Sequence, residues 1–255
     1  MLKKRIIFKL YFKDNFFCLS RNFKLQKVGT IDWLFNNLNF MNIANFIDEL
    51  VIINVNEKNY KNPIIKEFKL AIQKLMKKTF IPLTIGGGLR NLSQVNDCFA
   101  IGADKILLNT AIRKDKKFVK NCVKKFGSQA ILCGIDFKLE KNNFYTYTEN
   151  GKEKFFSLKE HILLAKNMKV GELFLTSIDR DGTGFGYEKK ILKYLNVNFP
   201  VVLGGGAGKP QHFEEFILEK KISGLMTGNL FNFVGSGLEE LRLKIIKQGV
   251  NLRKI

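Results

Sequence analysis

Two glycine triplets stand at corresponding places in the two halves of the chain. Residues 86–88 follow the apolar segment 82–85, and residues 204–206 follow the apolar segment 200–203. Glycine adopts positive φ angles and lets backbone N–H groups approach an anion closely. Each triplet precedes an apolar run that leads to an asparagine, Asn109 in the first half and Asn229 in the second. The pattern predicts two phosphate sites, with tight turns that bind no ligand as the alternative.

A third polar segment, residues 176–183, reads Thr-Ser-Ile-Asp-Arg-Asp-Gly-Thr and continues an apolar run. Hydroxyls, carboxylates and a glycine at the end of a strand suit a ligand that carries hydroxyl and phosphate groups. An Asx turn at Asp181 and Gly182 would explain part of the segment without any ligand.

Asp136 ends the apolar run 130–135, where a carboxylate is costly unless it is paired or used. At the end of a strand it could act as a general acid or base. The alternative is a residue that hydrogen-bonds to the backbone. Its counterpart in the first half of the chain is Tyr11. Because a tyrosine has an ordinary pKa of about 10, it is a poor substitute for a carboxylate as a proton donor at neutral pH.

Four charged residues stand at or just before apolar runs, at the opposite ends of the expected strands. They are Arg5, Glu49, Lys105 and Glu172. Two cations and two anions at one end of a barrel could form a closed ring of salt bridges. Each of them could instead simply face water at the rim.

The elements that would position these groups recur about every thirty residues. Strand-like apolar runs lie near 5–10, 50–55, 82–85, 105–109, 130–136, 172–177, 200–203 and 223–228. Segments with helical periodicity lie between them, as in residues 33–46, 65–75, 118–123 and 238–246. Capping sequences begin at Asn91 and Ser157. Eight strands that alternate with helices are typical of a (β/α)₈ barrel.

The two halves of the chain also match in order. Phe12-Lys13 corresponds to Phe137-Lys138 and Glu49 corresponds to Glu172, just as the two glycine triplets and the two asparagines do. The sequence therefore predicts a single TIM-barrel domain over residues 1–255, built from two similar half-barrels. An open doubly wound sheet is the alternative, but it would not need such a repeat.

Composition narrows the classes of function. The formal net charge is +20, but the lysines are spread over nearly every expected helix, which favours general solvation over nucleic-acid binding. There is no run of about 18 apolar residues, so we expect no membrane association and a cytoplasmic location. The four cysteines lack C-x-x-C spacing and are expected to be reduced and mostly buried, with no metal or cofactor.

With these residues in view, the chain resembles the HisF family, the cyclase subunit of imidazole glycerol phosphate synthase. The resemblance rests on Lys4-Arg5-Ile6-Ile7, the segment 176–183, Gly205-Gly206-Ala207-Gly208-Lys209 and residues 249–253. It implies a lyase-type amidotransferase complex in which a HisH glutaminase supplies ammonia through the barrel. Ammonia then reacts with a phosphorylated ribulosyl imidazolecarboxamide nucleotide, giving imidazole glycerol phosphate and aminoimidazole carboxamide ribotide.

The resemblance also assigns roles residue by residue. Phosphate and substrate would lie near Gly87, Gly88, Asn109, Thr110, Thr176, Asp181, Gly182, Gly205, Gly206, Gly228 and Asn229. The charged gate to the ammonia path would be Arg5, Glu49, Lys105 and Glu172.

Three positions at the catalytic end depart from the family pattern. Tyr11 stands in place of the catalytic aspartate of the first strand, Leu19 in place of a loop lysine and Asn54 in place of an aspartate, so that Asp136 alone remains of the catalytic pair. Such paralogues occur beside N-acetyl sugar amidotransferases in surface-polysaccharide pathways, where ammonia converts an acetamido into an acetamidino group. We therefore expect a HisF-like ammonia-delivering subunit of that branch, without full cyclase activity. The alternatives are HisF itself in histidine biosynthesis and a non-catalytic phosphate-binding barrel.

Overall fold

Eight parallel strands close into a barrel. The computed structural model describes residues 3–38, 40–56, 63–195, 199–228 and 237–252. Each strand hydrogen-bonds to the next in chain order, β12 pairs with β1, and β7 pairs with β10, which closes the ring. The strands are β1 (Arg5–Lys13), β4 (Glu49–Asn54), β5 (Leu83–Gly86), β6 (Lys105–Leu108), β7 (Ile131–Glu140), β10 (Glu172–Ser177), β11 (Val201–Gly204) and β12 (Ile222–Thr227). The predicted (β/α)₈ barrel is confirmed, and each of the eight apolar runs forms one strand.

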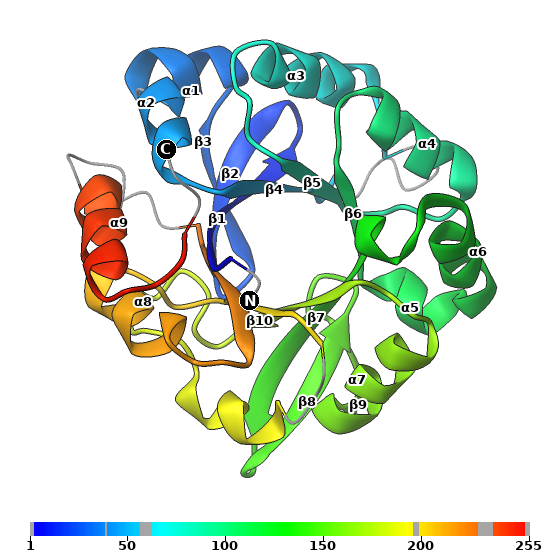
Figure 1. The fold of residues 1–255 in the computed structure, drawn as a ribbon. Helices are drawn as coiled ribbons and strands as arrows, with labels where there is room; N and C mark the ends of the chain where they lie inside the picture. The colour runs from blue at the N-terminus through cyan, green and yellow to red at the C-terminus, as the bar shows by residue number, and fades with distance from the viewer. Residues whose placement is uncertain (1–2, 39, 57–62, 196–198, 229–236, 253–255) are drawn as a thin grey trace.

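Helices surround the barrel as an outer ring (Figure 1). They are α1 (Ile31–Asn37), α2 (Phe40–Phe46), α3 (Lys66–Met76), α4 (Leu92–Ala100), α5 (Thr110–Lys114), α6 (Lys116–Phe126), α7 (Leu158–Asn167), α8 (Pro210–Ile217) and α9 (Gly237–Lys247), with 3₁₀ turns η2 (Ser128–Ala130) and η3 (Lys189–Tyr194). No helix in the described ranges is long and apolar enough to span a membrane.

Local signals account for several helix ends. Ser157 and Glu160 form the expected capping box at the start of α7. Asn91 caps α4, but the Gln94 side chain accepts from the Arg90 N–H instead of completing a box with Asn91. The segment 33–46, which shows helical periodicity in the sequence, forms two helices: α1 ends at Asn37 and α2 begins at Phe40. Asparagine-rich sequence at this junction has low helix propensity, since the short amides compete for backbone hydrogen bonds.

Two β-hairpins extend the barrel, and the sequence reading did not foresee them. β2 (Phe16–Arg21) and β3 (Lys24–Gly29) continue antiparallel from β1, while β8 (Asn143–Thr148) and β9 (Glu153–Ser157) continue from β7. Phe12 packs edge-to-face on Phe17, and Phe137 packs in the same way on Phe144, with ring centroids 5.4 Å apart in each case. The same strand-plus-hairpin unit therefore begins both half-barrels, as expected for a duplicated half.

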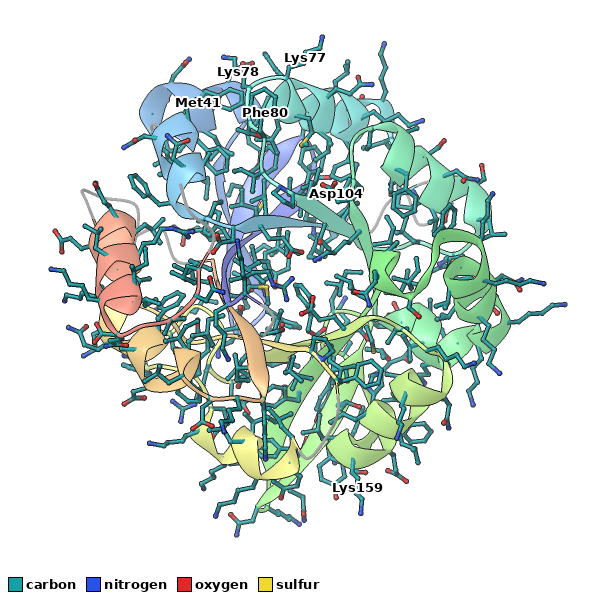
Figure 2. The ribbon with its side chains drawn as sticks, viewed as in Figure 1. Met41, Lys77, Lys78, Phe80, Asp104 and Lys159 are labelled. Atoms are coloured by element: carbon teal, nitrogen blue, oxygen red, sulfur yellow. The ribbon has the colours of Figure 1, made fainter. Side chains whose placement is uncertain are left out.

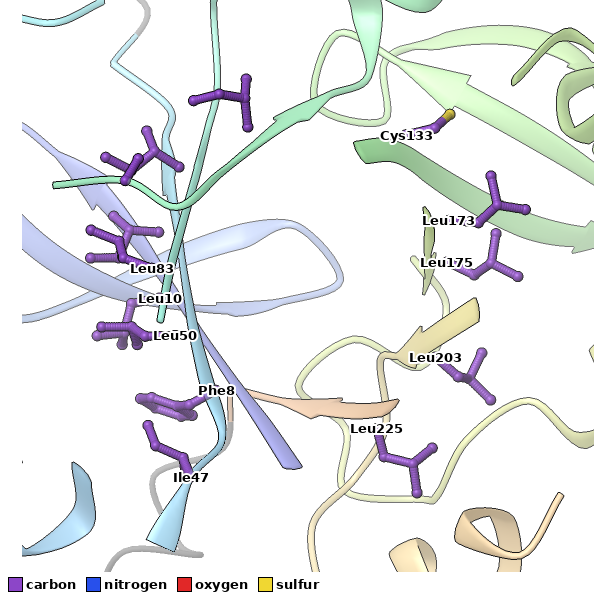
Figure 3. Packing of buried hydrophobic residues seen from close by; sticks show 14 of the residues in the cluster. Phe8, Leu10, Ile47, Leu50, Leu83, Cys133, Leu173, Leu175, Leu203 and Leu225 are labelled. Atoms are coloured by element: carbon purple, nitrogen blue, oxygen red, sulfur yellow. The ribbon is translucent and has the colours of Figure 1, made fainter. Parts of the chain in front are cut away.

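Strand side chains alternate between two apolar layers. Those that point outward pack against the helices, among them Phe8, Leu50, Leu83, Leu173 and Leu203 (Figure 3). Those that point inward form a smaller cluster inside the barrel, made of Ile7, Val51, Leu132, Phe174, Val202 and Met226, with Ile53 and Leu107 against it. Cys133 belongs to the outward layer, and all four cysteines are free and buried, as expected.

The outer surface carries the excess of lysine. Lys77, at the end of α3, and Lys159, in α7, lie at the edge of the molecule on different sides of the helix ring (Figure 2).

Candidate functional site at the two ends of the barrel

The four charged residues at the strand starts form a closed ring of salt bridges at the barrel floor. Each is the first residue of its strand, so the parallel barrel brings all four to one end. Glu49 accepts from Arg5 at 2.8 Å and from Lys105 at 3.0 Å. Glu172 pairs with Arg5 and lies 4.0 Å from the Lys105 ammonium. The ring that the sequence suggested as one of two possibilities is therefore present.

Neighbouring hydroxyls fix the two carboxylates. Thr84 donates to Glu49 at 2.6 Å, and Ser223 donates to Glu172 at the same distance. Glu49 is 1% exposed, whereas the side chains of Arg5 and Lys105 are 21% and 25% exposed. The ring thus presents cations to solvent and holds its anions inside the barrel.

The inward apolar cluster lies directly above this ring. Along β1 the inward positions alternate as Arg5, Ile7, Lys9 and Tyr11, and along β10 as Glu172, Phe174 and Thr176. Charge at the floor, an apolar layer in the middle and polar groups at the top therefore follow one another along both of these strands.

A cavity of about 610 Å³ opens at the top, where the strands end. Its base includes Phe174, Leu107, Ile53 and Met226, which belong to the apolar layer or pack against it. Several of the predicted site residues line its walls: Tyr11, Gly87, Gly88, Asn109, Thr110, Asp136 and Thr176. Gly87 and Gly88 both have positive φ, at 101° and 69°, as an anion-binding turn requires.

Asp136 lines the upper cavity. Its carboxylate accepts from Asn109 Nδ2 at 2.7 Å, and its backbone is in register with Thr176 of the neighbouring strand. The pKa of Asp136 is raised to about 7, mainly by burial; Lys9 and the Asn109 hydrogen bond oppose the shift, and the nearby Asp181 adds to it. A carboxyl group with that pKa can accept or donate a proton at neutral pH.

Tyr11 lies near Asp136 and contacts Lys9, whose ammonium is 4.9 Å from the centre of the Tyr11 ring. Burial raises the pKa of Tyr11 well above its ordinary value, and Lys9 only partly offsets this. The phenol therefore stays protonated at neutral pH. It does not replace a second ionised carboxylate.

Lys9 was missed by the sequence reading. It is 7% exposed, and its ammonium lies 3.7 Å from the carboxylate of Asp181. Strand periodicity could have identified it, since Lys9 falls between Arg5 and Tyr11 on the alternate residues of β1 that face inward.

The second group of predicted phosphate residues surrounds a much smaller space. Asp181, Gly182, Gly205, Gly206 and Gly228 line a volume of about 20 Å³. Gly205 and Gly206 have positive φ, at 89° and 109°, as in the first half. Asn229 lies outside the described residues.

Leu19 and Asn54, the other two departures from the family pattern, each make contacts that explain the side chain at that position. Leu19 lies in β2 and packs against the hydrophobic core. Asn54 ends β4, where its amide donates to the Pro63 carbonyl and its Oδ1 accepts from the Asn56 N–H at 3.1 Å. Neither side chain supplies a charge to the upper face.

Comparison with known proteins agrees with this arrangement. The sequence profile of the family described as "Histidine biosynthesis protein" matches residues 42–235. The chain is 38% identical over 242 residues to a protein of Parasynechococcus marenigrum named "Putative imidazole glycerol phosphate synthase subunit hisF2", covering 94% of this chain and 89% of the relative. It is 32% identical over 257 residues to the imidazole glycerol phosphate synthase subunit HisF of Prosthecochloris aestuarii, covering 99% and 100%.

A third relative, the HisF subunit of Leptospira biflexa, is 31% identical over 218 residues and is matched over 82% of this chain and 83% of its own length. The barrel, its two half-barrels and these similarities together show that the chain belongs to the histidine biosynthesis protein family, as a HisF-type member.

Proposed function

We propose that this chain is the ammonia-receiving subunit of a glutamine amidotransferase complex. A HisH-type glutaminase would bind at the floor, and ammonia would pass through the barrel to the upper cavity. There it would serve acetamidino-sugar formation together with an N-acetyl sugar amidotransferase.

The observation that carries the proposal is the vertical order of the barrel interior. The charged ring of Arg5, Glu49, Lys105 and Glu172 lies below an apolar layer, and that layer forms the base of the upper cavity. An apolar layer admits neutral ammonia and disfavours the ammonium ion, because moving a charge out of water is costly. A ring of ion pairs at its entrance supplies groups that can be displaced or rearranged by a partner.

The residues at the upper face favour ammonia delivery to another enzyme over cyclisation at this site. Tyr11 keeps its proton at neutral pH, so Asp136 lacks a second ionisable carboxylate at the end of the first strand. Loss of one member of an acid–base pair lowers rates by about 10²–10⁴. Ammonia that reaches this cavity would then be consumed slowly by cyclisation and remain available to another enzyme.

The test is reconstitution with the glutaminase and the sugar amidotransferase of the same genome. Glutamine labelled with ¹⁵N in its amide should transfer the label into an acetamidino sugar only when this chain is present. If the three proteins form no complex, or if the label appears in product equally well without this chain, the proposal is wrong.

A second candidate is imidazole glycerol phosphate synthase activity in histidine biosynthesis. It is favoured by Asp136, whose pKa of about 7 suits general acid–base catalysis, and by the names of the relatives. A steady-state assay with excess ammonia separates the two. A kcat in the ordinary enzyme range, about 1–10³ s⁻¹, would favour the histidine pathway.

A further inference from the structure

Two hydrogen-bond donors and one carboxylate face one another across the upper cavity. Lys9 and Tyr11 belong to β1, and Asp136 belongs to β7. Counted along the hydrogen-bonded ring, β7 is four strands away from β1 in either direction, so the two strands lie on opposite sides of the barrel. All three residues line the same cavity. A small ligand in the cavity can therefore have the donors on one side and the carboxylate on the other.

The donor side consists of a buried ammonium and a protonated phenol. Lys9 and Tyr11 are 7% and 9% exposed, and the ammonium lies 4.9 Å from the centre of the Tyr11 ring. The Asp181 carboxylate lies 3.7 Å from the ammonium, which is longer than a hydrogen bond, so this ion pair holds the charge in place without taking up an N–H group. Because burial raises the pKa of Tyr11, the phenol keeps its proton at neutral pH. Both groups can donate to a ligand oxygen.

The carboxylate side has the properties of a general base. Asn109 donates to Asp136 at 2.7 Å and so orients the carboxylate. The pKa of Asp136 is raised to about 7, mainly by burial, so that a large fraction of the carboxyl group is ionised at neutral pH and binds a proton more strongly than an ordinary carboxylate does. Proton removal next to a carbonyl group needs this combination, a base at the carbon and donors at the oxygen on which negative charge develops.

We propose that the upper face catalyses enolisation of a phosphorylated ketose, with Asp136 as the base and with Lys9 and Tyr11 as donors to the carbonyl oxygen. Asp136 removes a proton from the carbon next to the carbonyl group, the C–H electron pair forms a C=C bond, and the carbonyl π pair moves to the oxygen. Protonated Asp136 then returns a proton to carbon, so no oxidant, reductant or second reactant is needed. The phosphate position predicted at Gly87 and Gly88 lines the same cavity, which makes a phosphorylated ketose the substrate class. Ammonia delivery plays no part in this reaction.

Hydrogen exchange in D₂O measures this step directly. Ribulose 5-phosphate is incubated with the full chain in D₂O, and ¹H NMR follows the loss of the proton signals from the two carbons beside the carbonyl group. We expect exchange at least about 100-fold faster than in buffer alone. Ribulose, which lacks the phosphate, should exchange much more slowly. Asp136→Asn, purified in the same way, gives the background from contaminating isomerases.

Single substitutions separate the roles of the three residues. Asp136→Asn should reduce the exchange to background, and Lys9→Met should lower it by about 100-fold. Tyr11→Phe should lower it by about tenfold or more, since it removes one hydrogen bond to a charged oxygen. Lys27→Met is the matched control for Lys9, because Lys27 also lies over an aromatic ring, 4.6 Å from the centre of Phe16, but it is exposed and lies outside the cavity lining that the structure describes. The control should exchange at the wild-type rate.

Wild-type exchange no faster than that of Asp136→Asn would overturn the inference, as would a wild-type rate in folded Lys9→Met or equal losses in Lys9→Met and Lys27→Met. If Lys9→Met does not fold, because it leaves the buried Asp181 carboxylate without its cation, Tyr11→Phe decides, since it removes only a hydroxyl group. The failure of this inference and that of the proposed function are distinguishable. Transfer of ¹⁵N into an acetamidino sugar without ketose exchange would sink the inference alone, and exchange without that transfer would sink the proposed function alone.

Discussion

Glu49→Gln is the substitution that tests the floor ring most directly. The Glu49 carboxylate accepts from Arg5 at 2.8 Å, Lys105 at 3.0 Å and Thr84 at 2.6 Å, and is almost fully buried. Glutamine has nearly the same shape, but it removes the negative charge and can turn an NH₂ group toward two cations.

The expected cost follows from this geometry. Removing one partner of a fully buried ion pair costs about 3–5 kcal/mol. Here Arg5 and Lys105 are partly exposed, at 21% and 25%, and Glu172 still lies beside both. We therefore expect a loss of about 2–3 kcal/mol, less than the fully buried case because water screens the two cations. For a domain of this size that corresponds to a fall in Tm of about 5–10 °C.

Thermal unfolding measures the stability, and a paired assay measures the coupling. In complex with the glutaminase, the variant should hydrolyse glutamine while transferring less of the ammonia to product, whereas activity fed with external ammonia should stay near wild type. Glu153→Gln is the matched control, because Glu153 pairs with Arg113 at 2.8 Å on the surface, where such pairs contribute about 0–1 kcal/mol. Equal Tm values for the two variants, or full coupling in Glu49→Gln, would refute the reasoning.

Three further predictions concern the upper face, a buried histidine and a buried ion pair. Tyr11→Asp should raise turnover of the imidazole glycerol phosphate synthase substrate only in part in a steady-state assay, because the loop lysine is still missing. Asp136→Asn should abolish residual cyclase activity in the same assay and leave glutaminase binding intact in a pull-down. Burial lowers the pKa of His161 to about 4 from 6.5, so the unfolded chain binds the extra proton between these values. The contribution of neutral His161 to the free energy of unfolding is therefore complete above about pH 6.5 and falls by up to about 3 kcal/mol as the pH drops to about 4. In urea unfolding, His161→Gln should not show this loss of stability at low pH. The control His212→Gln, at a partly exposed histidine, should still show it. Arg242→Met should lower the free energy of unfolding in urea by about 3–5 kcal/mol, since it leaves the buried Asp48 carboxylate, which Arg242 contacts at 2.8 and 3.1 Å, without its cationic partner. A double variant that adds Asp48→Leu should recover much of this stability. A loss below about 1 kcal/mol in the single variant would count against the prediction.

The positions of the eight barrel strands could be predicted from local sequence. Each apolar run near a predicted position became one barrel strand, because fully buried parallel strands need continuous apolar side chains. The floor ring was readable for the same reason. Once Arg5, Glu49, Lys105 and Glu172 are each placed at a strand start, closure of a parallel barrel must bring them together.

The hairpins were not readable in this way. Residues 16–29 and 143–157 contain polar and charged side chains on strands that are only partly buried, so their apolar pattern is weak. The inward position of Lys9 could be predicted from strand alternation, but its ion-pair partner could not. Asp181 lies far along the chain, and only the fold places it 3.7 Å from the Lys9 ammonium.

By itself, the sequence determined the barrel, its internal duplication and the residue types at each strand end, since these depend on period-two burial and on glycine turns that act locally. Tertiary structure alone decided the contact between the first hairpin and the loop after β10. Ser20 and Asp181 are 161 residues apart, and their hydrogen bond forms only when the first hairpin folds back over the loop after β10. No local pattern encodes that contact, because its geometry depends on how the closed barrel places the ends of two distant strands beside one another.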